Sequence, residues 1–375
     1  MARAVSPRLM TSIAPFSPSV STVPESASRG ERDVALWLFG CAAMIFLMVM
    51  IGGGTRLTES GLSITEWQPI AGVIPPLSDA DWTREFDHYK AIPQYRAIHA
   101  SMTLAEFKTI FCWEYVHRLW GRLIGVAFAV PFLWFLWTRR LAWSLAPKLA
   151  VLFVLGGLQG ALGWYMVRSG LADRIEVSQY RLVAHLLAAV ALYIAILWVA
   201  LDLGFPRMSG HAAPPTVRRA LTSLLVLALI TLAAGGFVAG LRAGYLYNTF
   251  PLMNGYVVPP DYATANPWYL NPFESLAAAQ FDHRVLAELT WLGAMATWLW
   301  SLRLDLPPAL RNSIHVMAAI VTLQLSLGIA TLVLVVPLPL AVAHQAGALL
   351  LVTAILVPRH AARDRKIDGS PRPAL

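Results

Sequence analysis

Long apolar runs dominate the chain, and short polar segments separate them. Each run has about 20 residues, the length that a helix needs to cross the hydrocarbon core of a bilayer. The pattern predicts eight membrane-spanning helices, over residues 34–54, 113–137, 149–167, 180–202, 219–241, 284–302, 314–336 and 340–357. We therefore expect an all-α, multi-pass membrane protein embedded in a lipid bilayer.

Cationic residues collect in alternate connections between these runs and in the C-terminal tail. Basic loops tend to stay in the cytoplasm, so both termini are expected there and the long loops 55–112 and 242–283 outside. Residues 1–33 are rich in serine and proline and are expected to form a disordered cytoplasmic tail, with a targeting segment as the alternative. Residues 359–375 are expected to form a basic cytoplasmic tail.

The composition agrees with this membrane assignment. Hydrophobic residues make up 57% of the chain and charged residues only 13%, with a mean hydropathy of +0.58, values that exclude an ordinary soluble domain. The net charge of +8 would suit a nucleic-acid partner. Because the cations follow the membrane topology instead, no nucleic-acid partner is expected.

The first long loop contains signals for two helix starts. Ser78 is followed three residues later by Asp81, and Thr103 by Glu106, the spacing of a capping box. Aromatic residues follow the first start at helical spacing, and the second segment is expected to run on into the second span. The loop could serve as a lid over a substrate site or as a structural cap.

The chain contains an internal repeat. Three pairs of segments match: EYVHRL from Glu114 with QFDHRV from Gln280, LQGALG from Leu158 with LQLSLG from Leu323, and VAHLLA from Val183 with VAHQAG from Val342. We therefore expect two four-helix units, residues 34–205 and 206–358. Each unit has an even number of spans, so the two insert the same way up, as a parallel repeat.

Four histidines occupy repeat-related positions: His117, His185, His283 and His344. Each lies near the outer end of its span, so each unit offers two imidazoles at one depth. Two histidines facing each other inside a helix bundle are what a six-coordinate haem requires. Histidines that serve only in packing are the alternative, while the carboxylate or thiolate clusters of di-iron and zinc sites are missing from the sequence. The other five histidines are expected at surfaces or interfaces.

Arginines accompany these histidines at the outer ends of the helices. Arg118 and Arg284 directly follow two of the histidines, and Arg56 and Arg242 lie at the outer ends of the first and fifth spans. Haem propionates are anions that pair well with arginine. Arginines that reach to the membrane interface are the alternative interpretation.

Several small and polar residues within the spans also repeat or cluster. Gly52–Gly54 and Gly235–Gly236 permit close backbone approach, as do Gly160 and Gly163. Helix packing explains these glycines as well as a flat macrocycle does. Gln159 and Gln324 could form hydrogen bonds between helices.

The segment GGGTRLTESGLSITEWQPIAGVIPPL, the aromatic residues from Trp82 to Tyr95, and EYVHR resemble the haem A synthase family of the proteobacterial and mitochondrial type. The resemblance covers about residues 35–357. It implies two four-helix bundles and an enzyme that oxidises the C8 methyl group of haem O to a formyl group, giving haem A for cytochrome oxidase. By the same resemblance, His117 and His185 hold the substrate haem, His283 and His344 hold a haem b cofactor, and Glu114 is the catalytic residue.

The resemblance also implies partners and a location. We expect a bacterial inner membrane, with the mitochondrial inner membrane as the alternative, and an electron donor that the sequence does not identify. Haem O synthase, cytochrome oxidase assembly factors and a second copy of the chain are the expected protein partners. The Gram-positive type carries a cysteine pair in its first outer loop, and this chain lacks that pair.

A di-haem b electron carrier or quinol-oxidising cytochrome is the alternative function. Bis-histidine ligation alone does not separate the two functions. The repeat does, because Glu114 in the first unit is replaced by Gln280 in the second. A protein that only carried electrons would not need this difference.

Overall fold

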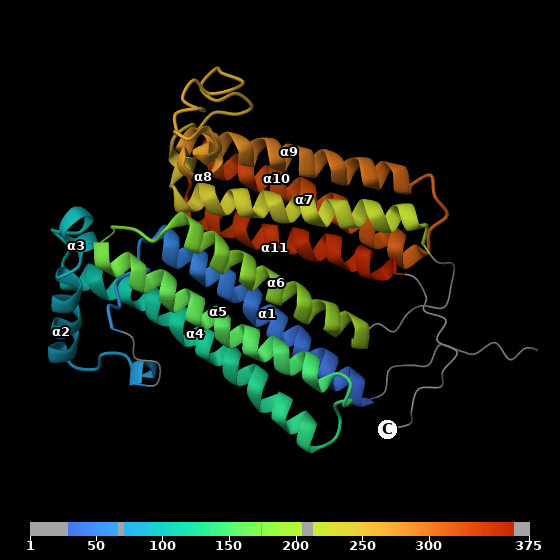
Figure 1. The fold of residues 1–375 in the computed structure, drawn as a ribbon, viewed down its shortest axis with the longest axis horizontal. Helices are drawn as coiled ribbons and strands as arrows, with labels where there is room; N and C mark the ends of the chain where they lie inside the picture. The colour runs from blue at the N-terminus through green and yellow to red at the C-terminus, as the bar shows by residue number, and fades with distance from the viewer. Residues whose placement is uncertain (1–28, 67–70, 174, 205–212, 364–375) are drawn as a thin grey trace, which may run out of the picture.

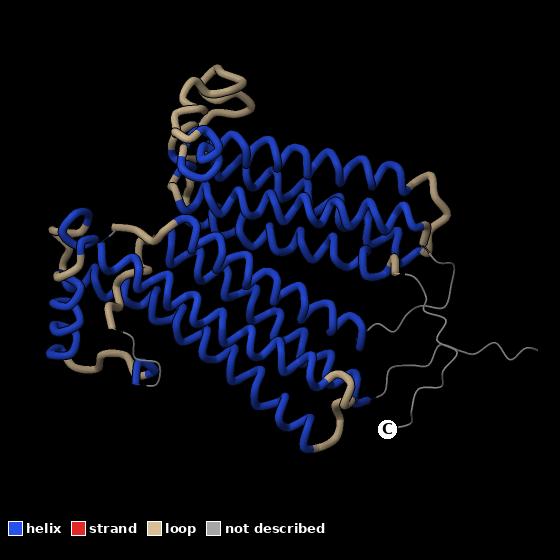
Figure 2. Tube along the Cα trace, in the orientation of Figure 1, coloured by secondary structure: helices blue, strands red, loops and turns tan. Residues whose placement is uncertain are grey.

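The computed structural model describes residues 29–66, 71–173, 175–204 and 213–363, and over these ranges the chain is helical with no strand (Figure 2). Eight helices in this part of the chain have 24 residues or more. They are α1 (Arg29–Leu57), α4 (Leu104–Trp137), α5 (Ala146–Asp173), α6 (Gln179–Gly204), α7 (Pro215–Gly240), α9 (Leu276–Ser301), α10 (Pro308–Val333) and α11 (Leu338–Ala361).

Seven of these helices are long and apolar enough to cross a membrane, which makes the chain a multi-pass membrane protein. The helix that falls short is α9. It has 26 residues, but Asp282, Arg284 and Glu288 lie in its first half. Membrane insertion of α9 therefore stays a prediction, which rests on the repeat and on its place in the bundle.

The long helices form two four-helix bundles, α1–α4–α5–α6 and α7–α9–α10–α11 (Figure 1). In the first bundle α1 and α5 each pack against both α4 and α6, so α4 and α6 are diagonal partners. In the second bundle α7 and α10 each pack against both α9 and α11. The repeat-related histidines lie on the diagonal helices, which places each pair across the middle of its bundle.

The bundles meet where α6 packs on α7 and where α11 packs on α1 and α6. At the end that carries the two long loops the packing is tight, because Gln345 leaves no room for a Cβ at Gly53. Further inward, the hydroxyls of Tyr193 and Thr353 lie 2.7 Å apart across the α6–α11 contact. The two units therefore touch along α11 for most of its length.

The two long loops lie at the same end of the molecule (Figure 1), as a parallel repeat requires. The first contains η1 (Ala71–Val73), α2 (Asp79–Lys90) and α3 (Pro93–Ile98), and the second contains η2 (Ala243–Tyr245), η3 (Trp268–Leu270) and α8 (Asn271–Glu274). Both expected capping boxes are confirmed, at Ser78 before α2 and at Thr103 before α4. The second segment does continue into the span, since α4 is one helix of 34 residues.

The first loop has a small hydrophobic core of its own. Tyr89 and Phe107 are fully buried, and Phe86 stacks on Phe107 with ring centroids 4.9 Å apart. Phe107 belongs to α4, so α2 is packed onto the N-terminal extension of that helix. This packing is what a structural cap needs.

The helix ends differ from the expected bounds in two places. The first span begins at Arg29, so residues 29–33, which were expected to be disordered, are helical. The last helix continues through Pro358 to Ala361, beyond the expected end at 357. The remaining tail residues, 1–28 and 364–375, lie outside the described residues.

Candidate functional site

The clearest site lies between His283 on α9 and His344 on α11. Their ring centroids are 6.4 Å apart and the ring planes make an angle of 78°. Two imidazoles bound to opposite faces of one metal ion, through metal–nitrogen bonds of about 2 Å, hold their ring centroids roughly 6 to 6.5 Å apart. The pair is therefore spaced for a single iron between the rings.

The Nδ1 atom of His283 supports the same interpretation. Nδ1 of His283 lies 3.1 Å from the carbonyl oxygen of Thr231, to which it donates a hydrogen bond. The proton then sits on Nδ1 and leaves the lone pair of Nε2 for a metal. Nδ1 of His344 is buried and has no hydrogen-bond partner within the described chain.

Each of the four histidine rings packs against a glycine of a neighbouring helix. An added Cβ would lie 3.3 Å from His117 at Gly52, 2.9 Å from His185 at Gly163, 2.8 Å from His283 at Gly235 and 2.8 Å from His344 at Gly328. Real Cβ contacts are essentially never shorter than 3.0 Å. At three of the four positions, therefore, any side chain would displace the imidazole. Gly160, by contrast, has nothing within 4 Å of an added Cβ.

In the first unit, His117 lies on α4 and His185 on α6. Gln159 of α5 donates hydrogen bonds to Nδ1 of His185, at 3.0 Å, and to its carbonyl oxygen, at 2.7 Å. In the second unit, Gln324 donates to the carbonyl oxygen of His344 at 3.0 Å. Both glutamines therefore form the expected bonds between helices.

Glu114 is 2% exposed and fully hydrogen-bonded. One carboxylate oxygen accepts from the hydroxyl of Ser63 at 2.7 Å and from the main-chain N–H of Ile64 at 2.8 Å. The other accepts from Nε and Nη2 of Arg118 at 3.0 and 2.5 Å. The glutamate thus ties the start of the first long loop to α4.

Arg118 and Arg284 hold loop carbonyls at equivalent places in the two units. Arg118 donates to the carbonyl oxygens of Ile64 and Glu66, at 2.8 and 3.2 Å. Arg284 donates to those of Tyr247 and Thr249, at 2.6 and 2.8 Å. Beside Arg284, Gln280 also donates to the carbonyl of Tyr247, at 3.0 Å.

Arg56 and Arg242 meet at the boundary between the two units. Arg56 bonds to one carboxylate oxygen of Glu176 at 2.9 Å, and Arg242 bonds to the other at 2.8 Å. Arg242 is also paired with Glu59, whose second oxygen lies 3.2 Å from Nε2 of His99. All four candidate arginines thus have protein partners, and their pairing with propionates stays a prediction.

Sequence reasoning did not single out Ser63, Glu59 or Glu176. They are polar residues of connecting segments, far in sequence from the arginines and the glutamate that they contact. Ser63 and Glu59 belong to the segment TRLTESGLSITEW, and that motif was the signal that could have identified them. Glu176 lies in a short connection with no such motif.

The other histidines have mixed positions. Nδ1 of His88 lies 3.6 Å from Glu66, and His315 accepts from Trp298 at 2.8 Å. His360 was expected in an exposed tail, but it lies in the last turn of α11, is 6% exposed and pairs with Asp202 at 3.1 Å. It is buried because α11 extends further than expected. His211 lies outside the described residues.

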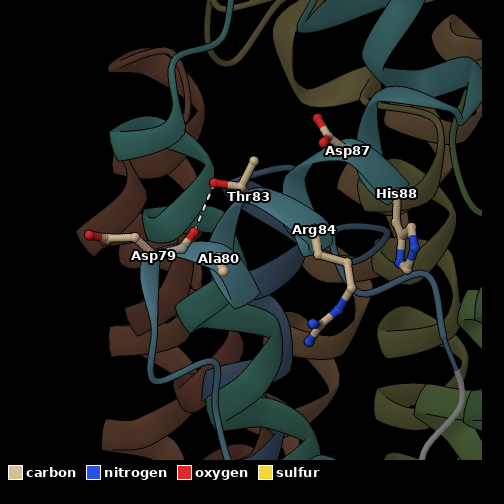
Figure 3. A pocket seen from close by; sticks show the side chains of 6 residues that line it. All are labelled: Asp79, Ala80, Thr83, Arg84, Asp87 and His88. Atoms are coloured by element: carbon tan, nitrogen blue, oxygen red, sulfur yellow. Dashed lines mark hydrogen bonds between the residues drawn. The ribbon is translucent and has the colours of Figure 1, made fainter.

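Two hollows on the molecule lie away from the histidine pairs. A shallow depression of about 550 Å³ lies on α2, where Asp79, Thr83, Arg84, Asp87 and His88 point outward from one helix (Figure 3). An apolar groove of about 940 Å³ runs between α5, α6 and α7, with Lys148 at one end. None of the four histidines lines either hollow.

The number of side-chain ligands limits the kind of metal that the histidine pairs can bind. Within the described residues no group of three or more His, Cys, Asp or Glu side chains could hold a metal ion. Each pair therefore suits a metal that brings its other ligands with it, as the iron of a haem does through its porphyrin.

The family assignment agrees with this site. Residues 35–356 match the model of the COX15-CtaA family, described as cytochrome oxidase assembly protein. The chain is 49% identical over 349 residues to the Heme A synthase of Nitrosospira multiformis, covering 92% of this chain and 98% of that protein. It is 48% identical over 349 residues to the Heme A synthase of Rhodospirillum centenum, covering 93% and 92% of the two chains. The chain therefore belongs to the COX15-CtaA cytochrome oxidase assembly family.

Proposed function

We propose that this protein is a haem A synthase of a bacterial inner membrane, which oxidises the C8 methyl group of haem O to a formyl group. The observation that carries the haem-binding part of the proposal is the pair His283 and His344, whose ring centroids lie 6.4 Å apart, a spacing that suits one iron. The curated relatives, which align with almost the whole chain, carry this enzyme name. The repeat extends the argument to the first unit, where His117 and His185 hold the equivalent positions on α4 and α6.

The second unit would hold haem b as the resident cofactor. His283 and His344 would ligate it, and the bound haem would supply one-electron transfer. The chain's own residues set the ring positions. Thr231 keeps the proton of His283 on Nδ1, and Gly235 and Gly328 let both rings approach the neighbouring helices.

The first unit would hold haem O as substrate through His117 and His185. Glu114 lies three residues before His117 and therefore on the same face of α4, one turn outward. Each carboxylate oxygen of Glu114 already accepts two hydrogen bonds. The glutamate is thus suited to hold a fixed charge and a fixed loop at the mouth of this site.

Histidine variants test the division between the two units. In His283→Ala or His344→Ala, most of the stoichiometric haem b should be lost from the purified protein. In His185→Ala, haem A formation should stop while haem b is retained. Full haem b in both of the first variants, or a normal haem A yield in the third, would contradict the assignment.

Pigment analysis separates the proposal from the alternative electron carrier. The protein purified from cells that make haem O should contain haem B with smaller amounts of haem O and haem A. The di-haem carrier would contain haem B alone, and cells that depend on this chain for haem A would then contain none.

A further inference from the structure

The two units differ in what faces the outer nitrogen of a histidine. In the second unit, Nδ1 of His283 faces a carbonyl oxygen, that of Thr231, at 3.1 Å. In the first unit, Nδ1 of His185 faces an amide nitrogen, that of Gln159, at 3.0 Å. A carbonyl oxygen only accepts a hydrogen bond, and an amide NH₂ only donates one.

These partners select opposite tautomers of the neutral imidazole. His283 donates from Nδ1, so the lone pair is on Nε2, where a metal can bind it. His185 accepts at Nδ1, so its proton is on Nε2. A metal that binds this Nε2 must first displace the proton, and the hydrogen bond from Gln159 must break or turn.

Turning the amide of Gln159 around would not remove the conflict. The amide oxygen would then lie where the nitrogen is now, 2.7 Å from the carbonyl oxygen of His185, which is an acceptor facing an acceptor. The NH₂ group would take the place of the present amide oxygen. That place is buried and offers no hydrogen-bond partner in the described chain. The orientation in which Gln159 donates is therefore favoured.

The equivalent glutamine of the second unit does not compete in this way. Gln324 donates to the carbonyl oxygen of His344 at 3.0 Å, as Gln159 does to that of His185. Nδ1 of His344, however, has no hydrogen-bond partner among the described residues. The repeat thus offers two glutamines at matched positions, of which Gln159 opposes metal binding by its histidine.

We propose that Gln159 is a positioning residue that makes His185 a readily displaced haem ligand. The first unit can then bind haem O and release haem A, whereas the second unit keeps its haem. The identity of these haems rests on the proposed function, but the weakened ligation by His185 does not. Loss of about one net hydrogen bond on ligation predicts haem release about tenfold faster than from a site without this conflict.

Haem transfer to apomyoglobin tests the proposal without turnover. The full-length protein is loaded with haem B, and transfer is followed by absorbance, with the fast phase assigned to the first unit by its loss in His117→Ala. Gln159→Leu removes the donor at similar size and should slow the fast phase about tenfold. Gln324→Leu is the matched control and should leave the fast phase unchanged. Release from Gln159→Leu as fast as from the unchanged protein would overturn the proposal.

A second variant guards against a packing defect in Gln159→Leu. Gln159→Met also removes the donor while keeping the side-chain length, so that Nδ1 is free to carry the proton that ligation through Nε2 requires. Its fast phase should also slow, and the low-spin fraction of the first-unit haem should rise. Faster release from this variant would overturn the proposal. Slowed release in both variants, from a protein that forms no haem A, would instead reject the proposed function and retain the role of Gln159.

Discussion

Glu114 and Gln280 hold the same place in the two repeats, yet they bond to their loops differently. Glu114 accepts from Ser63 and Ile64 and is paired with Arg118. Gln280 donates to a single carbonyl oxygen, and its amide oxygen is buried without a partner within the described residues. The first unit therefore has the more firmly held loop, beside the proposed substrate.

Glu114→Gln should abolish haem A formation, while the protein keeps its haem b. The oxygen of an amide accepts hydrogen bonds, but its NH₂ group does not, so the amide cannot accept from both the Ile64 N–H and Arg118. The charge and part of the loop anchor are therefore lost together. Ser63→Ala separates the two effects, because it leaves the carboxylate and Arg118 in place. If the anchor matters, Ser63→Ala should lower haem A formation several-fold, and if the charge alone matters, it should not. Near-normal haem A from Glu114→Gln would exclude both roles.

At the scale of the helices, the glycines opposite the histidines decide how closely the spans approach. An added Cβ at Gly328 would lie 2.8 Å from Cε1 of His344, and one at Gly163 would lie 2.9 Å from Cε1 of His185. The same contact recurs in both bundles, so it belongs to the repeated unit. The haem-binding geometry thus depends on the helix beside each ligand as well as on the helix that carries it.

Gly328→Ala should displace the ring of His344 and reduce the haem b retained by the purified protein to less than about half. The displacement should also weaken the low-spin spectrum of the haem that remains. Gly160→Ala is the matched control, since nothing lies within 4 Å of its added Cβ. Equal haem content in the two variants would show that α10 does not set the position of His344.

The helices and the histidines could be predicted from the sequence because their signals are local. A run of about 20 apolar residues specifies a span by itself, and repeated motifs pair His117 with His283 and His185 with His344. The partners of Glu114 and of the arginines depend on how the loops fold back, which no local pattern records. The same reason explains the misplaced His360, which pairs with Asp202, 158 residues earlier.

At the scale of the whole molecule, two repeat-related arginines meet at one carboxylate. Arg56 ends α1 and Arg242 follows α7, and Glu176 bonds to both. Glu59 and His99 extend this network into the first outer loop. The sequence shows that the two units are alike, but their docking depends on this contact between a connecting segment and two helix ends.

The network should make the outer loop sensitive to acid. Burial lowers the pKa of His99, whose ring lies between Tyr89 and Glu59. A histidine whose pKa is lower in the folded state stabilises that state fully at a pH above its unfolded-state pKa of about 6.5. This stabilisation is lost as the pH falls through the folded-state pKa. The thermal midpoint should therefore drop as the pH falls below about 6.5, and less so in His99→Gln. An equal drop in both proteins would contradict this account.

Removal of the shared carboxylate tests the contact between the units. Glu176→Gln leaves Arg56 and Arg242 side by side without the charge between them. The loss of two partly buried ion pairs and the new repulsion should destabilise the protein by about 1 kcal/mol or more.

Asp87→Asn is the control, because its pair with Lys90 lies on one exposed helix and should contribute little. The difference between the two variants in thermal unfolding should shrink at high salt, which screens the repulsion between the arginines. Thermal midpoints that fall equally, or not at all, would mean that helix packing alone holds the two units together.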